Sequence, residues 1–417
     1  MNKPKIAILT LHPYDYGGVL TSVKTLYKFA QQSFDPTLFY LNFDSQISTS
    51  LKSLKFKNSI KKTTFQGMNA VEVGARHAFW EPGHYVYTMP LWREVFKDYD
   101  YFLFESGTCI AAYPLVKLNK KFAMVLAASY QDDRSQRVQH LSFFRKFIDF
   151  FAQFKMQKME KMILEKADYI LPISSDTKKR VDQILGFKRE KIAICGFPIS
   201  TKVKNKNLSE SKNIIAVGRF ADPRKNFDML MMAFANIYQQ SKHSQLYVVG
   251  KKPEDKILEK YSSLSFYRNI IFTGILQEKE LNEFYEIADL MLITSYQEGL
   301  GIIGLEAMSY GIPVVATDCG GTRDYVINGK NGFLVNIDDD KDMANRALQI
   351  LSSPDLYKKF SDYALTFIKD SYSQKRFESI IKYGLINVYP ELKEHFYKSD
   401  SDKESLIIDQ KQKQQEV

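Results

Sequence analysis

The stretch SYQEGLGIIGLEAMSYGIPVVATDCGG, residues 295–321, decides the fold that we expect of this chain. It follows the short apolar run DLMLITS, residues 289–295, whose length and polar boundaries predict a buried strand. After a glycine-bearing turn, residues 302–310 have helical composition, and a glycine and a proline end that helix. A second apolar strand is expected at 314–317. Together these segments predict a βαβ unit and therefore an α/β fold with parallel strands.

The turn of this unit is a candidate ligand site. Open α/β sheets bind ligands at the carboxyl ends of their strands. Glycine lets backbone N–H groups approach a ligand closely, and the amino end of a helix favours phosphate over a neutral group. We therefore expect an anion to be bound by the backbone of Gly299, Leu300, Gly301, Ile302 and Ile303.

Two glutamates accompany this turn, Glu298 at its start and Glu306 in the helix. Neither carboxylate would help to bind phosphate, but both can accept hydrogen bonds from hydroxyl groups. The combination suits a ligand with a diphosphate in the middle and a sugar ring at each end. The alternative is an ordinary βαβ crossover whose two glutamates are solvated on a helix face.

The two glutamates with seven residues between them, the glycines of the turn and the following GIPVVATDCGGTRDYVINGKNGFLV resemble the family 4 glycosyltransferases of the GT-B fold. The resemblance implies two Rossmann-like domains, with parallel sheets facing across a cleft and a C-terminal helix that crosses back to the N-terminal domain. It also implies a retaining enzyme that uses a nucleotide sugar. In that family the first glutamate, here Glu298, meets the transferred sugar, the second, here Glu306, holds the ribose, and the loop amides meet the diphosphate.

A second phosphate-binding segment is expected earlier in the chain, at GRFADPRKNFDMLMMAF, residues 218–234. A strand, a glycine, a basic loop and a helix follow one another, and Arg219 and Lys225 could place two cations on a diphosphate. The segment resembles one in which the family's arginine and lysine hold the donor diphosphate and stabilise the leaving nucleotide. The alternative is a pair of surface cations at the start of a helix.

Further substrate contacts are implied by the resemblance alone. The backbone beside Gly274 would read the base, with Ile275 and Leu276 as walls of the nucleobase pocket. In the first domain, the pair Gly17 and Gly18 would lie under the diphosphate and the acceptor. Most glycine pairs in loops only make turns, so this pair is a weak signal by itself.

The sequence departs from the family pattern after the strand expected at 123–128. Family members usually carry a histidine there that contacts the transferred sugar, whereas this chain reads AASYQDDR. Ser129, Asp132 and Arg134 could take over hydrogen bonding, or the segment is simply a polar loop. The departure raises a second hypothesis, a GT-B protein that has lost transfer activity and acts as a glycan- or nucleotide-binding partner or chaperone of an active enzyme.

Composition indicates a globular protein with room for two domains, because 417 residues carry 45% hydrophobic and 25% charged side chains. Three widely spaced cysteines indicate neither a disulfide framework nor a zinc site. The first strand is expected within five residues of the amino terminus, which leaves no room for a signal peptide, and no segment has the length needed to span a bilayer. We therefore expect a cytoplasmic protein, or one peripheral on the inner membrane face.

The net charge of +10 arises in the first 200 residues, where basic side chains outnumber acidic ones. This half also contains a helical stretch dense in Phe, Met and Lys at 141–163, which could lie on an anionic membrane. A Phe and Met stripe at helical spacing is more often packed into a core.

The acidic run at 338–340 resembles a metal site, but acidic residues also favour a helix start, which is the better interpretation.

The domains expected are an acceptor-binding domain at 1–198, a nucleotide-sugar-binding domain at 199–375, a returning helix at 376–398 and a disordered tail at 399–417. The function expected is a metal-independent, retaining hexosyltransferase that uses a nucleotide diphosphate sugar, most simply UDP-linked, as co-substrate and has no other cofactor. Its acceptor would be a glycan, glycolipid or glycoprotein in polysaccharide biosynthesis. An epimerase or phosphorylase and a nucleic-acid binder fit the residues less well.

Overall fold

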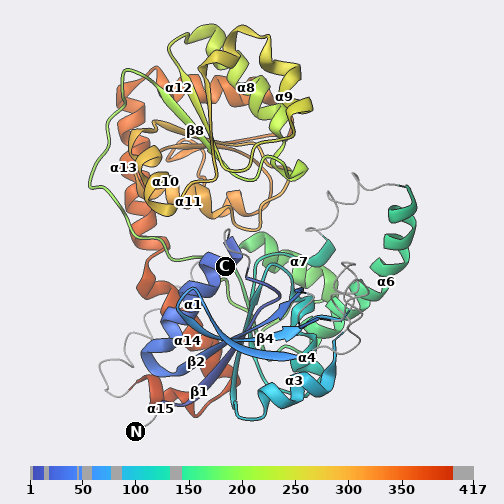
Figure 1. Ribbon diagram of the computed structural model, residues 1–417. Coiled ribbons are helices and arrows are strands. Elements are labelled where there is room, and N and C mark those ends of the chain that lie inside the picture. The colour runs from blue at the N-terminus through green and yellow to red at the C-terminus, as the bar shows by residue number, and fades with distance from the viewer. Residues whose placement is uncertain are drawn as a thin grey trace.

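The chain folds into two α/β domains, stacked one above the other and joined by a long helical connection (Figure 1). This description rests on a computed structural model. It covers residues 3–13, 18–44, 47–48, 59–76, 87–131 and 143–397, and within 143–151 the backbone alone. Each domain is built on its own mainly parallel sheet, as the βαβ pattern predicts.

The first domain contains a seven-stranded sheet in the order β3-β4-β2-β1-β5-β6-β7. All neighbouring strands are parallel except the β3–β4 pair. Most of the parallel strands are apolar on both faces, because helices cover both sides of the sheet. The strands are β1 (Lys5–Leu9), β2 (Asp35–Asn42), β3 (Ile60–Phe65), β4 (Met68–Gly74), β5 (Tyr101–Ser106), β6 (Ala123–Leu126) and β7 (Tyr169–Pro172).

The sequence pattern also predicts strands at 63–71 and 191–196, and these two predictions are wrong. Residues 63–71, expected to be one strand, instead fold back as the antiparallel β3–β4 hairpin. Gln66 and Gly67 both have positive φ, 48° and 80°, which gives the tight two-residue turn that suits a hairpin. Residues 191–196, also expected to be a strand, make only one isolated bridge, between Ile192 and Ile170 of β7.

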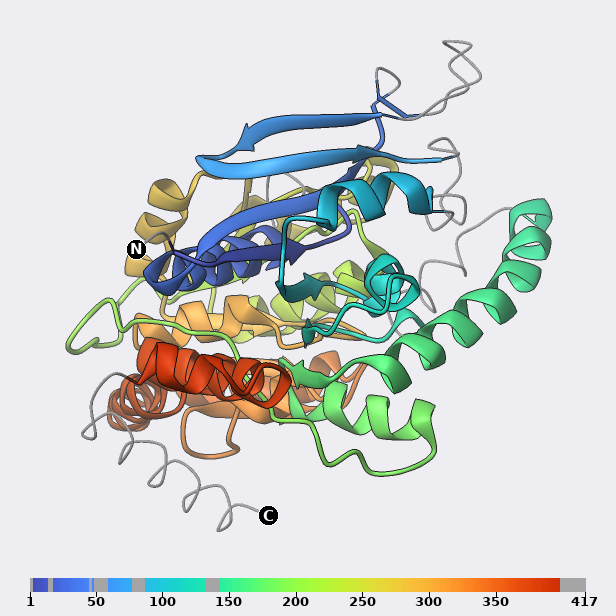
Figure 2. The ribbon, with the colours of Figure 1, turned by 90° about the horizontal axis from the view of Figure 1, so that it is seen from below.

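Helices cover the two faces of the first sheet unequally. Helix α1 and the returning C-terminal helix pack on one face, and the other helices of the domain pack on the opposite face. In Figure 2 the amino-terminal half of α6 extends beyond the body of the domain. The helices are α1 (Gly18–Ser33), α3 (Met89–Phe96), η1 (Cys109–Ala112), α4 (Tyr113–Lys117), α6 (Phe143–Lys166) and α7 (Ser175–Leu185).

The second domain has a six-stranded sheet in the order β10-β9-β8-β11-β12-β13, with every neighbouring pair parallel. Its strands are β8 (Asn213–Val217), β9 (Gln245–Val249), β10 (Ile270–Gly274), β11 (Leu290–Ile293), β12 (Val314–Thr317) and β13 (Gly332–Val335). Its helices are η2 (Pro223–Lys225), α8 (Phe227–Gln240), α9 (Asp255–Ser262), η3 (Ser265–Asn269), α10 (Glu278–Ile287), α11 (Ile302–Ser309), η4 (Gly321–Asp324) and α12 (Asp340–Leu351).

The acidic run at 338–340 begins a helix, as expected. Asp339 caps α12 by accepting a hydrogen bond from the backbone N–H of Asp342 at 2.9 Å. Asp338 accepts a 2.7 Å hydrogen bond from the side chain of Asn226 instead of facing a shared metal position. Among the described residues, no three His, Cys, Asp or Glu side chains are grouped so that they could hold a metal ion.

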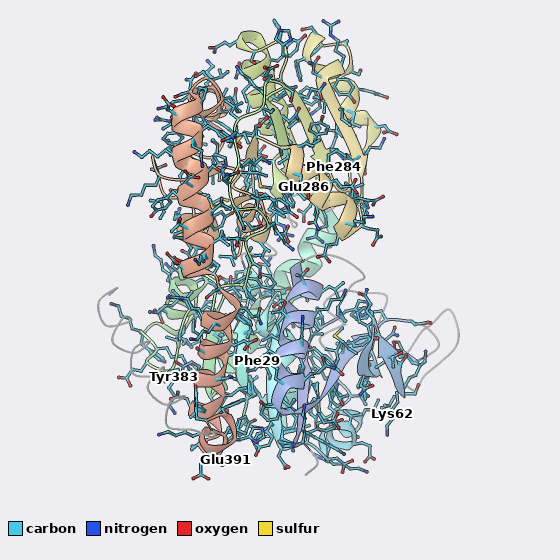
Figure 3. All side chains as sticks on the ribbon, turned by 90° about the vertical axis from the view of Figure 1, so that its left-hand side faces the viewer. Phe29, Lys62, Phe284, Glu286, Tyr383 and Glu391 are labelled. Carbon is cyan, nitrogen blue, oxygen red and sulfur yellow. The ribbon has the colours of Figure 1, made fainter. Side chains whose placement is uncertain are left out.

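The chain returns to the first domain at its end, which confirms the crossing helix. Helix α13 (Pro354–Ser371) packs on the second domain, and α14 (Gln374–Val388) and α15 (Leu392–Phe396) pack on the first. In α14, Gly384 lies so close to Leu171 of β7 that a Cβ would come within 2.9 Å of its Cδ1. Figure 3 shows this crossing, with Tyr383 and Glu391 in the lower half of the molecule. The domain limits themselves stay predictions.

Candidate active site between the two domains

The candidate site lies where the carboxyl ends of the second sheet meet the first domain. Strands β8 and β11 are neighbours at the point where the order of the sheet reverses, since β9 follows on one side of β8 and β12 on the other side of β11. Such a switch point is where open α/β sheets bind ligands. Lys225 follows β8 and Glu298 follows β11, so each comes from one side of the switch point.

Lys225 and Glu298 form an ion pair, with 2.5 Å between Nζ and Oε1. Both side chains are largely buried, at 17% and 12% exposed. The Ser295 hydroxyl donates a second hydrogen bond to the same carboxylate oxygen, at 2.6 Å. A charge pair that is shielded from water interacts more strongly than a surface pair, so these three side chains form a defined polar centre.

The local backbone fixes Lys225 from two sides. Asp222 caps the short helix η2 by accepting from the N–H of Arg224 at 3.1 Å, and Asn226 ends it in a left-handed conformation with φ 48°. Thr294, at the end of β11, donates to the Lys225 carbonyl at 2.8 Å. The lysine is therefore tied to the loops of both strands that flank the switch point.

The glycine turn opens directly into α11. Gly301 has φ +77°, and its carbonyl accepts a hydrogen bond from Tyr325 Oη at 3.0 Å. Helix α11 begins at Ile302, and the first N–H groups of a helix have no intrahelical acceptor. Leu300 is only 2% exposed and belongs to the core, so it can contact a ligand only through its backbone, whereas Ile302 and Ile303 are half-buried.

Glu306 lies further along α11 and has its own partner. Its Oε2 accepts a 3.0 Å hydrogen bond from the hydroxyl of Tyr285, which stacks on Tyr310 with 5.4 Å between ring centroids. Burial raises the pKa of Glu306 to about 7, although the Tyr285 hydrogen bond acts in the opposite direction. Burial therefore favours the neutral form of this carboxyl group more than water does.

Arg219 is not brought to the Lys225 and Glu298 pair. Its side chain is 53% exposed, and its nearest carboxylate is that of Asp222, at 3.9 Å. Arg224, which the sequence did not single out, lies closer to this carboxylate and forms a 2.7 Å ion pair with it. Arg219 is thus half-exposed and holds a long contact with Asp222.

The carboxyl ends of β8, β9 and β10 pack together next to Ile275 and Leu276, the residues expected to face the nucleobase. Gly250, after β9, donates to the carbonyl of Gly274 at 2.8 Å and has φ +114°. A Cβ at Gly250 would lie 2.1 Å from the carbonyl oxygen of Gly218, so only glycine allows this close packing. Next to Gly274, Ile275 is 53% exposed and Leu276 is half-buried.

The first domain contacts the glycine turn directly. A Cβ at Gly299 would lie 2.5 Å from the carbonyl oxygen of Ala127, which follows β6. At the start of α1, a Cβ at Gly18 would lie 3.9 Å from Cδ1 of Ile302, so the amino ends of α1 and α11 face each other. Gly17 lies outside the described residues.

The polar replacements expected after β6 are only partly visible. Ser129 is buried, and the next residue, Tyr130, donates its backbone N–H to the side chain of Glu160 in α6 at 2.6 Å. Asp132 and Arg134 lie outside the described residues.

Several residues of the site were missed by reasoning from the sequence. Ser295 and Tyr285 hold the two glutamates, and Ser175 and Asp324 join the domains beside the turn. Ser295 stands three residues before Glu298, a spacing that could have drawn attention to it. Tyr285, in an amphipathic helix, has the sequence signature of an ordinary core residue.

The fold defines the class of protein: two Rossmann-like domains whose strand ends meet across a site, with a C-terminal crossing helix, make the GT-B fold. Among solved structures, the sucrose-phosphate synthase of Thermosynechococcus elongatus is similar over 91% of this chain and 97% of its own, with a TM-score of 0.71 at 17% identity. HepE of Anabaena, solved in complex with UDP, is similar over 91% of this chain and 99% of its own, with a TM-score of 0.66 at 16% identity.

Residues 199–367 match the family model of glycosyl transferases group 1, and the chain as a whole has the GT-B fold. The N-acetyl-alpha-D-glucosaminyl L-malate synthase of Bacillus anthracis is 29% identical over 203 residues, which are 48% of this chain and 49% of the relative. The chain spans about half the length of the curated relatives it matches. Within the described residues, no helix has the length and apolar character needed to cross a membrane.

Proposed function

We propose that this chain is a retaining glycosyltransferase that moves a hexose from a nucleotide diphosphate sugar, UDP-linked, to a glycan, glycolipid or glycoprotein acceptor. The observation that carries the proposal is the Lys225–Glu298 ion pair beside the amino end of α11, at the switch point of the second sheet. It combines a cation and backbone N–H groups for a diphosphate with a carboxylate for sugar hydroxyls. The UDP bound to HepE of Anabaena, a chain of the same fold, supports the choice of donor.

The proposed chemistry depends on neutralising the leaving diphosphate. Lys225, Arg219 and the amides at the start of α11 would supply positive charge where negative charge develops. As the bond to the leaving phosphate breaks, the positive charge on the sugar is shared with that phosphate on the same face. The acceptor oxygen then attacks from this face, its proton passes to the departing phosphate, and the configuration is retained without an enzyme nucleophile.

The ion pair would change partners during this cycle. Lys225 and Glu298 hold each other at 2.5 Å, and the donor diphosphate would take the ammonium group as its new partner. Glu298, still bound by the Ser295 hydroxyl, would then accept hydrogen bonds from the sugar hydroxyls. At the other end of the donor, Glu306 would accept from the ribose and Ile275 and Leu276 would face the base.

The two cations would perform the charge neutralisation that a divalent metal supplies in other transferases. We therefore propose transfer without a metal and without a cofactor beyond the nucleotide sugar. The test is a screen of purified protein against a panel of nucleotide sugars for binding and slow hydrolysis, with and without EDTA. Release of nucleotide from one sugar nucleotide, unchanged by EDTA, is the expected result. Activity that EDTA abolishes and Mg²⁺ or Mn²⁺ restores would contradict the metal-free mechanism.

The second candidate is a GT-B partner protein that binds nucleotide or glycan without transfer. It is favoured by the segment after β6, where the sequence Ala127 to Gln131 carries no histidine. The intact Lys225, Glu298 and Ser295 centre argues against it, because a site that no longer reacts has no need to keep a buried charge pair. Binding of a nucleotide sugar with no turnover on any acceptor preparation would favour this candidate.

We also propose a peripheral contact with an anionic membrane through residues 141–163. In the described part of this stretch, Met156, Met159 and Ile163 pack into the core, while Phe154 is 61% exposed and the side chains of Lys155, Lys158 and Lys161 are exposed. A helix with basic residues on one side and an exposed aromatic is suited to the surface of an anionic bilayer. Sedimentation with phosphatidylglycerol vesicles but not with phosphatidylcholine vesicles is expected, and equal sedimentation with both would contradict the contact.

A further inference from the structure

The amino end of α7, in the first domain, is bound by a carboxylate from the second domain. Ser174 caps the helix by accepting from the N–H of Thr177 at 3.1 Å. The next residue, Ser175, donates its backbone N–H to Asp324 Oδ2 at 2.6 Å and its hydroxyl to Asp324 Oδ1. A negative group at a helix amino end is favoured by the helix dipole and by the unpaired N–H groups there. Asp324 therefore acts as a capping group across the domain boundary.

The same turn of α7 reaches the glycine turn of the candidate site. Thr177 Oγ1 donates to the carbonyl oxygen of Ala127 at 2.9 Å, and this is the oxygen that a Cβ on Gly299 would approach to 2.5 Å. Asp176 pairs with Arg323 at 3.4 Å, and its Oδ2 lies 3.1 Å from the position of a Cβ on Gly320. Ser175 and Asp176 thus contact the second domain directly, and Thr177 contacts it through the carbonyl group of Ala127.

These contacts involve the segment that contains Glu298 and the segment that is hydrogen-bonded to it. The N–H of Glu298 donates to the carbonyl of Cys319 at 2.9 Å, and the N–H of Gly321 donates to the carbonyl of Glu298 at 3.0 Å. Gly299 continues one segment and Gly320 lies in the other. The amino end of α7 is therefore packed against both of the segments that these two hydrogen bonds join. Asp324 follows Gly321 by three residues.

We propose that Asp324 and Ser175 are positioning residues, which clamp the amino end of α7 onto the 298–301 turn and so couple closure of the two domains to the placement of Glu298. The clamp rests on the proposed function, since it orients that function's donor site. Ser175 is exposed and Asp324 only half-buried, so the bond lies at the rim of the cleft. A bond at the rim can open for substrate entry and product release without unfolding either domain.

The clamp predicts a separation between binding and turnover. The nucleotide end of the donor is bound by the second domain alone, so the affinity for UDP does not depend on the clamp. The reaction requires Glu298 in its correct position, so kcat depends on the clamp. Asp324→Ala and Ser175→Ala are each expected to lower kcat by roughly tenfold, as the loss of a hydrogen bond to a charged group implies, and to leave the Kd for UDP unchanged within twofold.

The double variant provides the decisive comparison. Because Asp324→Ala removes both bonds and Ser175→Ala removes only the hydroxyl bond among them, the double variant is expected to be no slower than Asp324→Ala alone. Asp342→Ala is the matched control, since Asp342 is an aspartate of the same domain that pairs with Arg346 on α12. Its kcat should equal that of the wild type. Unchanged kcat in the single variants, or effects that multiply in the double variant, would overturn the clamp.

A second measurement tests the clamp without any turnover. Small-angle X-ray scattering of the full chain with UDP is expected to give a larger radius of gyration for Asp324→Ala and Ser175→Ala than for the wild type and Asp342→Ala. Equal radii in all four proteins would overturn the clamp. If the wild type itself turns over no nucleotide sugar, the proposed transfer activity fails, and the scattering result still decides whether the clamp holds the domains together.

Discussion

At the scale of single residues, Lys225 is the side chain on which the proposed chemistry depends most. It is largely buried and bound to Glu298, and the Ser295 hydroxyl donates to the same carboxylate oxygen. Its charge is needed when the leaving group becomes negative. Glu306, by contrast, would hold the ribose equally in the ground state and the transition state.

We therefore predict different kinetic effects for the two residues. Lys225→Ala should lower kcat by about 10²–10³-fold, because it removes stabilisation specific to the transition state. Glu306→Ala should mainly raise the KM for the donor. Steady-state kinetics on the donor that the screen identifies measure both effects. Lys358→Ala, which removes an exposed lysine paired with Asp362 on α13, is the control. Equal changes in kcat and KM for both variants would count against the assignment.

A buried carboxyl group in the first domain makes stability depend on pH. Glu105, at the end of β5, is 2% exposed, and burial raises its pKa from 4.5 to about 8, although a hydrogen bond from Ser22 acts in the opposite direction. Within the described structure, its Oε2 and the neighbouring Thr10 Oγ1 have no hydrogen-bond partner. The folded state therefore favours the neutral acid.

The sign of the effect follows from the raised pKa. The stabilisation from the neutral acid is complete below pH 4.5 and is lost as the pH rises through about 8. Between about pH 5 and pH 8 this group should lower the free energy of unfolding by about 1 kcal/mol per pH unit, and above pH 8 its contribution should level off. Denaturant unfolding between pH 5 and 8 should show this slope in the wild type and a flatter one in Glu105→Gln. Glu94→Gln, on the exposed surface of α3, should keep the wild-type slope, and a Glu105→Gln protein with that same slope would contradict the prediction.

The sequence identified only part of the site at this scale. Lys225 and Glu298 could be selected because glycines and strand ends mark their loops in the sequence. Their hydrogen-bond partners could not, because contacts such as Tyr285 with Glu306 and Ser175 with Asp324 join residues that are distant in the sequence. Arg219 was selected with the same reasoning as Lys225, yet its side chain is 53% exposed and lies 3.9 Å from the carboxylate of Asp222.

At the scale of secondary structure, α11 is set in place by one tyrosine. Tyr325 is fully buried, its hydroxyl donates to Gly301, and its ring fills the space beside Gly304. A Cβ at Gly304 would lie 2.4 Å from Tyr325 Oη and 2.6 Å from Cε2. Since real atoms do not approach so closely, either the helix or the tyrosine must move when this position carries a side chain.

We predict that Gly304→Ala destabilises the protein by about 1–3 kcal/mol, the usual cost of overpacking a core, and weakens donor binding by shifting the amino end of α11. Thermal unfolding and the Kd for UDP measure the two effects. The control is Gly107→Ala, at a glycine of the first domain where a Cβ would make only an ordinary contact, 3.8 Å from Val19. If Gly304→Ala matches this control in both measurements, α11 is not held as described.

Elements with strong apolar runs were predicted well, and short polar ones were not. Strands β8, β12 and β13 have the limits that the sequence predicts, 213–217, 314–317 and 332–335, because buried parallel strands are apolar throughout. The β3–β4 hairpin was missed because its turn, Gln66–Gly67, lacks the usual asparagine or aspartate before the glycine. The segment at 191–196 has the composition of a strand, but its hydrogen bonds to β7 make only one isolated bridge, at Ile192.

At the scale of the whole molecule, the two domains differ in how far their ligand-facing residues can be predicted from the sequence. The second domain matches a family model at residues 199–367, and its ligand loops carry sequence patterns. In the first domain, the fold follows from apolar strands, but the side chains that face the cleft follow no such pattern. The two domains are held together by the α7 contacts and by the crossing of α13 and α14 (Figure 1).

The central claim is that glycosyl transfer takes place at Lys225 and Glu298. The most direct test measures nucleotide release from the donor sugar nucleotide, in EDTA, by the wild type, by the Lys225→Ala, Glu298→Ala double variant and by a Lys358→Ala, Asp362→Ala control that removes an exposed ion pair on α13. Release by the wild type and the control, reduced at least about 100-fold in the double variant, is the predicted result. Release at the wild-type rate by a folded double variant would contradict the claim, because the reaction would then proceed without the charge pair on which the site is built.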